Sequence, residues 1–409
     1  MSAAASEDQP AGSQLLRSGA SLAVATMIAG VLGYVYILVL TRSLGPEQYG
    51  ILGSLLGLSV VLSVASTALQ LEAMRAVASD PSAPRDWLRR RGRIISIATG
   101  AVTLAAGPVI VEVLRLPTWA PVLALAALMV PQTYIGVQLG ILLGAGRTGA
   151  FSLLLVLSGL SRTLAAILTA ALKESPAFAL WASAATGVAV LLLGALLVCA
   201  AEPPRHTSAE VATPRDWSGV WRAAVGAGAL VVLLNADLLA ARAVLPDRES
   251  GWYAFLTVFG RVTFWGTNFI ALWVFPHEAA HGSAAQARAY ALGAVAGIAG
   301  FAFVAAVVGG RAITAALAGP EYADAAHFAP WFAIAGSLLS VVQLATYVDV
   351  ARARQVLSLI LWTGSVVLVV AIRWLAPHTI AGAIWATIIV LGVVALAGVL
   401  SMRERSSAT

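Results

Sequence analysis

Residues 380–402 read IAGAIWATIIVLGVVALAGVLSM and contain no charged side chain. An α-helix of this length is about 34 Å long, which is enough to cross the roughly 30 Å hydrocarbon core of a bilayer. Similar apolar runs fill nearly the whole 409-residue chain, in which 60% of residues are hydrophobic and 11% are charged. The mean hydropathy is +0.88. These values exclude a soluble globular domain, and the lack of period-two alternation argues against a membrane β-barrel.

The apolar runs predict an all-α polytopic membrane protein with twelve transmembrane helices. The polar, proline-containing segment 201–217 divides the spans six and six, so we expect a six-helix lobe over 1–200, a cytoplasmic linker and a second six-helix lobe over 218–409. The predicted spans are 18–40, 51–74, 94–114, 119–144, 150–172, 177–200, 218–245, 251–275, 289–310, 326–350, 356–376 and 380–402.

The two halves show signs of a duplication. At an offset of 200 residues, Arg42 and Pro46 match Arg242 and Pro246, and an acidic residue follows each proline. Because six spans return the chain to its starting side, the two halves would have the same orientation. Transporters built from such parallel repeats enclose a central cavity.

Charge is distributed unequally between the two sides of the membrane. Of the 25 lysines and arginines, 16 lie on the side of the termini and 7 on the other side in this topology. Cytoplasmic loops carry the excess of basic residues in membrane proteins. We therefore predict a multi-pass protein of the cell inner (plasma) membrane with both termini in the cytoplasm.

Several kinds of chemistry are absent from the sequence. The loops are too short for a soluble catalytic domain, Cys199 is the single cysteine, and the histidines show no HExxH spacing. No phosphate-binding Gly-x-x-x-x-Gly-Lys-Ser/Thr motif is present. We expect no enzyme activity, no metal site and no cofactor, so that any function must come from the helix bundle.

The segment Leu44-Gly45-Pro46-Glu47-Gln48-Tyr49-Gly50 predicts a turn between two helices. Gly45 permits an unusual backbone angle, and Pro46 suits the first turn of a new helix. The segment resembles the Leu-Gly-Pro-x-x-Tyr-Gly signature of Wzx-type lipid-linked oligosaccharide flippases, which belong to the multidrug/oligosaccharidyl-lipid/polysaccharide (MOP) superfamily. Residues 319–325 resemble the Gly-x-x-Tyr-x-x-Ala element of the same family.

The resemblance implies a transporter that works by alternating access. Such a protein flips a polyprenyl-diphosphate-linked oligosaccharide from the cytoplasmic to the outer leaflet for cell-surface polysaccharide biosynthesis. The implied partners are this glycolipid, membrane lipids, and glycosyltransferases or a polysaccharide polymerase, with no nucleic acid. A drug/cation antiporter of the same superfamily and a non-transporting scaffold of polysaccharide assembly are the alternatives.

Charged residues inside the predicted spans indicate the substrate site, because an ionisable group in hydrocarbon must face a cavity or a partner. Arg261 lies near the middle of the eighth span, and Asn268 lies on the same helical face. We expect both to bind the substrate, together with Arg17 and Arg75 at the cytoplasmic mouth. Alternatively, Arg261 pairs with an acid such as Asp237, and the two mouth arginines only mark the membrane interface.

Two further intramembrane charges have open roles. Asp237, with Asn235 beside it, either balances Arg242 or Arg261, or acts as a gating or proton-coupling acid. Arg162 lies in the middle of the fifth span, where we expect a structural pair within its lobe in preference to a substrate contact.

The segment Arg85–Arg93 contains five arginines and Trp87. We expect it to be a cytoplasmic loop that lies at the membrane surface, where anionic lipid headgroups attract it.

Overall fold

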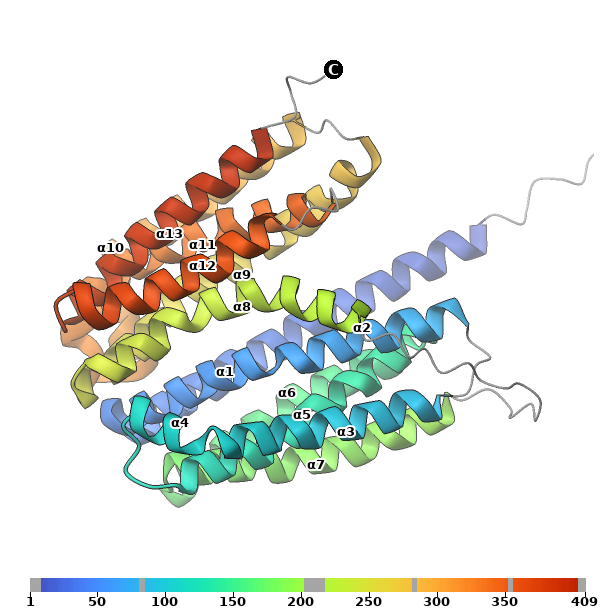
Figure 1. Cartoon of the computed structure of the whole chain (residues 1–409), viewed down its shortest axis with the longest axis horizontal. Coiled ribbons are helices and arrows are strands. Elements are labelled where there is room, and N and C mark those ends of the chain that lie inside the picture. Colours follow the sequence, from blue (N-terminus) through green and yellow to red (C-terminus); the bar gives the residue numbers. More distant parts are fainter. Residues whose placement is uncertain (1–8, 81–84, 202–217, 282–284, 352–355, 404–409) are drawn as a thin grey trace, which may run out of the picture. The chain divides into compact units, whose positions relative to one another are not determined.

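The computed structural model describes residues 9–80, 85–201, 218–281, 285–351 and 356–403, and all regular structure in these ranges is helical (Figure 1). The elements are α1 Gln9–Leu62, α2 Val64–Ser79, α3 Asp86–Ala105, α4 Gly107–Val113, α5 Ala120–Gly144, α6 Thr148–Leu172, α7 Pro176–Ala200, α8 Ser218–Val244, α9 Asp247–His281, α10 Ala285–Ala318, the 3₁₀-helix η1 Pro320–Phe328, α11 Ala329–Ala351, α12 Val356–Val370, the π-helix η2 Ala371–Leu375 and α13 Ile380–Arg403.

Each of the twelve predicted spans overlaps one or two of these helices. In the described residues, eight helices are long and apolar enough to cross a membrane, or nine if α3 and α4, which are bent by 53°, form one broken span. This count takes Ser21–Ser79, which covers most of the first predicted span and all of the second, as one helix, and it does not include α8 and α9. The chain is therefore a multi-pass membrane protein, as predicted.

The predicted turn at Gly45 is confirmed. Gly45 has φ 69° and ψ 172°, which is non-helical backbone inside α1, and the helix resumes at Pro46. Glycine adopts a positive φ without the steric penalty of a side chain, and proline is preorganised for the first helical turn. A kink at this position therefore separates the first two predicted spans.

The described helices group into two compact units. Unit 1 comprises residues 1–43, 62–108 and 118–224, and unit 2 comprises residues 44–61, 109–117 and 225–409. The part of α1 after the kink thus packs with the C-terminal half of the chain. The predicted linker 201–217 lies, except for Ala201, outside the described residues, and the two six-helix lobes stay a prediction.

Small residues allow helices of unit 1 to approach closely. Gly136, Gly140 and Gly144 recur every four residues along α5, and a Cβ on any of them would collide with the α2 backbone. For Gly140 the colliding atom is the carbonyl oxygen of Gln70. Backbones in lipid approach best at glycine, because dispersion forces and not the hydrophobic effect hold the helices together.

The arginine-rich segment 85–93 is not a loop. It forms the N-cap and first turns of α3, with Arg85 and Arg91 buried. Arg91 forms an ion pair with Glu72 of α2, and Arg85 donates a hydrogen bond to the Ala201 carbonyl (3.2 Å) just beyond the end of α7. These side chains pair with a half-buried carboxylate and bind a helix-end carbonyl, so they hold unit 1 together.

Unit 2 packs α11 against both α9 and α13. The α9–α11 contact is closest at Gly260 and Gly336, where a Cβ on Gly336 would collide with the Gly260 backbone. Beside it, Tyr253 and Phe332 make an edge-to-face contact with ring centroids 4.8 Å apart. Helices with small residues at the contact can therefore place large aromatic side chains in the adjoining core.

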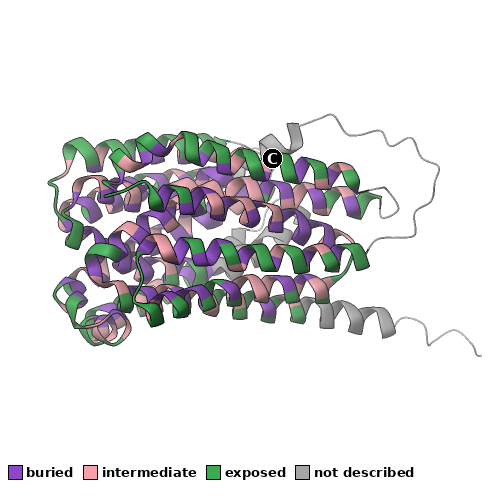
Figure 2. Cartoon of the chain, turned by 90° about the horizontal axis from the view of Figure 1, so that it is seen from below, coloured by how far each residue is buried: buried purple, intermediate pink, exposed green. Residues whose placement is uncertain are grey.

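Individual helices present different faces to the surface and to the core (Figure 2). On α6, Leu160, Leu164 and Leu168 are exposed, whereas Ala165 and Ala166 are fully buried. The exposed side chains are large and apolar, as expected for residues that contact lipid tails.

We expect Gly140→Leu to destabilise unit 1, because the added side chain meets the Gln70 carbonyl on a backbone that has no room to move. Overpacking of this kind costs about 1–3 kcal/mol. Thermal unfolding of the purified protein in detergent would show a lower Tm, while Gly149→Ala, at a helical position with no atom within 4 Å of the added Cβ, serves as the control. Equal Tm values for the Leu variant and the wild type would contradict the close α2–α5 approach.

Candidate functional site

Arg261 and Asn235 form a polar pair between α9 and α8. The Arg261 Nη2 atom donates a hydrogen bond to Asn235 Oδ1 at 2.9 Å. Asn235 is 1% exposed, and its amide nitrogen donates to the Val231 carbonyl of its own helix (2.8 Å). Gly57 of α1 faces the same amide, since a Cβ there would lie 3.6 Å from Asn235 Oδ1. The buried amide thus holds one edge of the guanidinium in place.

Asp237 lies in a second polar group that joins α8, α9 and α13. The Tyr253 hydroxyl donates a hydrogen bond to Asp237 Oδ2 at 3.1 Å and lies 3.3 Å from Thr387 Oγ1. Tyr253 is completely buried. Tyr253, Thr257 and Arg261 follow one another every four residues, so this group and the Arg261 pair belong to one stripe of α9.

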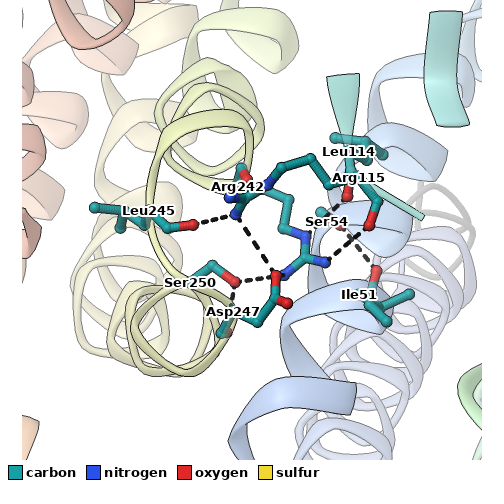
Figure 3. A network of polar contacts seen from close by, with 8 residues as sticks. All are labelled: Ile51, Ser54, Leu114, Arg115, Arg242, Leu245, Asp247 and Ser250. Carbon is teal, nitrogen blue, oxygen red and sulfur yellow. Dashed lines mark hydrogen bonds and ion pairs between the residues drawn. The ribbon is translucent and has the colours of Figure 1, made fainter. Parts of the chain in front are cut away.

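A third network surrounds Arg242 at the end of α8 (Figure 3). Its side chain is 2% exposed, and Nη1 lies 3.0 Å from Asp247 Oδ1 and donates to Ser250 Oγ at 2.7 Å. Nε donates to the carbonyl of Leu114 at 3.0 Å. A buried guanidinium needs several acceptors, and here they come from the first turn of α9 and from the turn after α4.

Arg115 completes this network from the turn after α4. Its Nη2 atom donates to the carbonyls of Arg242 (2.9 Å) and Leu245, and lies 3.6 Å from Asp247 Oδ1. Its backbone is left-handed, with φ 49°. Two arginines therefore share one carboxylate, and Arg115 also binds the carbonyls at the end of α8, where a cation is favoured.

The turns at Pro46 and Pro246, which match in sequence, are neighbours in unit 2. A Cβ on Gly251 would collide with the Pro46 carbonyl, and one on Gly50 would lie 2.7 Å from Ser250 Oγ. The start of α9 therefore crosses the part of α1 after the kink at two glycines.

The structure brings some of the predicted site residues together. Arg261 contacts Asn235, with Asp237 two residues further along α8, whereas Arg75 is exposed on α2 in unit 1. The side chains of Arg17 and Asn268 lie outside the part of the chain that the structure describes in atomic detail.

One alternative for Asp237, a pair with Arg242, is wrong, and the pair expected for Arg162 is not found among the described residues. Arg242 pairs with Asp247 and not with Asp237, because the turn at Pro246 returns the carboxylate to the end of α8. Arg162 is exposed on α6, and among the described residues no carboxylate lies within 4 Å of its guanidinium, so the structural pair expected for it is not found.

Several polar residues were missed in the sequence, including Tyr253, Thr387, Ser250 and Arg115. An isolated hydroxyl gives no signal in an apolar span, since most Ser and Thr hydroxyls bond to their own helix. Opposite charges at Arg242 and Asp247, on either side of a proline turn, were the available signal for the third network. No group of three or more metal-ligating side chains occurs among the described residues.

No known protein-family model matches the chain, and no curated protein matches its sequence. Several solved structures share its fold. A MATE-family multidrug resistance transporter of the MOP superfamily, in the inward-facing conformation, matches with a TM-score of 0.72 and 14% identity over 96% of this chain and 100% of that one.

Two other neighbours differ in what they carry. The lipid II flippase MurJ has a TM-score of 0.67 and 9% identity, covering 93% of this chain and 87% of its own. The MATE multidrug transporter DinF-BH has a TM-score of 0.64 and 12% identity, covering 98% of this chain and 96% of its own. The chain thus has the fold of MOP-superfamily transporters, and the predicted fold class is confirmed. These neighbours are transporters and a flippase, not enzymes.

We expect Arg242→Gln to lower the free energy of unfolding by about 1–3 kcal/mol, because hydrogen bonds to a charged group are lost in a buried place. Asp247→Asn should have a smaller effect, since the Asp247 side chain is 61% exposed. In a double-mutant cycle measured by unfolding in detergent, the two changes should couple by about 0.5–1 kcal/mol. Arg311→Gln, at an exposed position, is the control. If the effects of Arg242→Gln and Asp247→Asn are additive, the ion pair between Arg242 and Asp247 is contradicted.

Proposed function

We propose that the chain is a flippase for a polyprenyl-diphosphate-linked oligosaccharide in cell-surface polysaccharide biosynthesis. It would expose the headgroup site to each side of the membrane in turn while the lipid tail stays in the bilayer. Three observations support the proposal: the fold, which the lipid II flippase MurJ shares; the Leu-Gly-Pro-x-x-Tyr-Gly motif at the kink of α1; and the cationic side chain of Arg261.

Arg261 is the observation that carries the proposal. It lies well inside α9, and it donates one described hydrogen bond, to Asn235. A guanidinium has five N–H donors in a rigid fork that matches the oxygens of a phosphate. Among the described residues no carboxylate lies within 4 Å of this guanidinium, so the remaining donors suit an anionic headgroup.

The driving force follows from the charge of the substrate. Moving an anion outwards across an inside-negative membrane is favoured by about 2.3 kcal/mol per charge at 100 mV. The excess of arginine on the side of the termini would attract the headgroup in the cytoplasm. With the termini in the cytoplasm, we place the protein in the inner (plasma) membrane, with glycosyltransferases or a polymerase as partners.

A drug/cation antiporter is the second candidate, and the fold shared with MATE transporters favours it. A cationic substrate calls for a carboxylate in the site, which only Asp237 would supply on the α8–α9 stripe. Reconstituted vesicles separate the two functions: a flippase moves a labelled polyprenyl-diphosphate glycolipid between leaflets, whereas an antiporter moves a cationic dye against a proton or sodium gradient.

Replacing Arg261 should abolish transport. We expect Arg261→Ala to lose flipping at a near-normal protein level, and Arg261→Lys to retain part of it, because lysine keeps the charge but not the fork. Val262→Ala, at the next and exposed position of α9, is the matched control. Normal flipping by Arg261→Ala in reconstituted vesicles would refute the anion site.

The orientation can be tested with the single native cysteine. Cys199 is exposed near the end of α7 and should react with a membrane-impermeant maleimide only after the cells are broken. In a Cys199→Ser background, His378→Cys, in the exposed turn before α13, should react in intact cells. The opposite labelling pattern would invert the topology.

Asp237 is our candidate for gating or proton coupling, with Asn235 beside it. Asp237→Asn should fold normally, because the amide oxygen still accepts the Tyr253 hydroxyl bond, but transport should lose its dependence on pH. Flipping is measured in vesicles across a pH series, with Tyr253→Phe as the control for loss of the bond alone. A destabilised Asn variant with unchanged pH dependence would assign Asp237 a structural role.

A further inference from the structure

Arg162 is an intramembrane arginine that the proposed function does not use. It lies near the middle of α6, which runs from Thr148 to Leu172 and is long and apolar enough to cross the membrane. Its side chain is exposed. An arginine at this depth keeps its proton, so it requires water, an anion or a partner.

The position of Arg162 around the helix excludes a simple contact with lipid. The exposed apolar stripe of α6 contains Leu160, Leu164 and Leu168, and a residue two positions away lies about 200° around the helix. Arg162 thus belongs to the opposite face, with Ala165 and Ala166, which are fully buried. An exposed side chain on the packed face indicates an opening there.

Helix α1 borders this opening. Thr163 Oγ1 donates to the Leu32 carbonyl at 3.0 Å, and a Cβ on Gly159 would lie 3.2 Å from Leu32 Cβ, so α1 and α6 cross closely at this point. Tyr36 lies one turn further along α1.

The surroundings of Arg162 differ from those of the structural arginines. Arg91 and Arg242 are buried and bind carboxylates, and Arg85 caps a helix end. Arg162 has no carboxylate within 4 Å among the described residues. Its environment is similar to that of Arg261, which is also intramembrane, accessible and without a described carboxylate at that distance.

We propose that Arg162, near the crossing of α1 and α6, is a second binding residue for the diphosphate group of the lipid-linked substrate, in a water-accessible opening along α6. This inference rests on the proposed function and extends it. Unit 1 then carries an intramembrane arginine that suits an anionic group. The guanidinium fork provides bidentate contacts to phosphate oxygens.

The first test measures access of water to the site. In a Cys199→Ser background, Arg162→Cys should react with a negatively charged, membrane-impermeant methanethiosulfonate at least about tenfold faster than Leu164→Cys, because thiolates form only in contact with water. The two positions lie at nearly the same depth on opposite faces of α6. Equal reaction rates at the two positions, or no reaction of Arg162→Cys, would refute the water-accessible opening.

The second test measures binding of farnesyl diphosphate to the purified protein in phosphatidylcholine nanodiscs. Arg162→Gln should weaken binding about tenfold, as expected when a charged hydrogen-bond donor is lost. Arg162→Lys should be intermediate. The exposed Arg90→Gln should bind like the wild type, and farnesol, which lacks the diphosphate, should not distinguish the variants.

The outcomes separate the two proposals. Loss of binding in Arg261→Gln with unchanged binding in Arg162→Gln overturns this inference and leaves the proposed function standing. No binding of farnesyl diphosphate by the wild type overturns both. If Arg162→Gln and Arg90→Gln have the same Tm, the weaker affinity of Arg162→Gln is not a folding defect. If Arg162→Gln weakens the binding of farnesol and of farnesyl diphosphate equally, the contact with the anion is overturned.

Discussion

The hydrocarbon core of the membrane offers no hydrogen bonds, and the structure follows from this constraint. Every backbone N–H and C=O group there must be satisfied within the chain, so the described part of the protein is helical throughout. Because lipid tails are as apolar as leucine, the helices associate through close packing. Glycines such as Gly140 on α5 and Gly336 on α11 therefore mark the tightest contacts, where backbone meets backbone.

The same constraint divides the arginines into two groups. Arg91 and Arg242 are buried, and each has a carboxylate partner, so their charges are used to join segments within a unit. Arg162 lies near the middle of the apolar helix α6 and Arg261 lies well inside α9, and in the described part of the chain neither has a carboxylate within 4 Å. Since an unpaired charge is unfavourable in hydrocarbon, their retention is best explained by a function that involves an anion.

The two proposed arginines are consistent with one physical picture of transport. A diphosphate carries charges that hydrocarbon does not solvate, and a guanidinium fork replaces part of its hydration shell. Asn235 orients Arg261, whereas Arg162 lies near the crossing of α1 and α6. The rigid network around Arg242 contrasts with both, because its acceptors are all supplied by the protein.

Local sequence determined the helices and the kink at Gly45, because both depend on neighbouring residues. Contacts between distant segments were decided only by the tertiary structure. A pair between Arg242 and Asp237 was one of the alternatives from the sequence, whereas Arg242 pairs with Asp247. Arg162 was expected to have a partner, and 85–93 was expected to be a loop. Hydropathy shows that a residue lies in the membrane, but the helix face that its side chain occupies, and the neighbour it meets there, depend on how the helices pack.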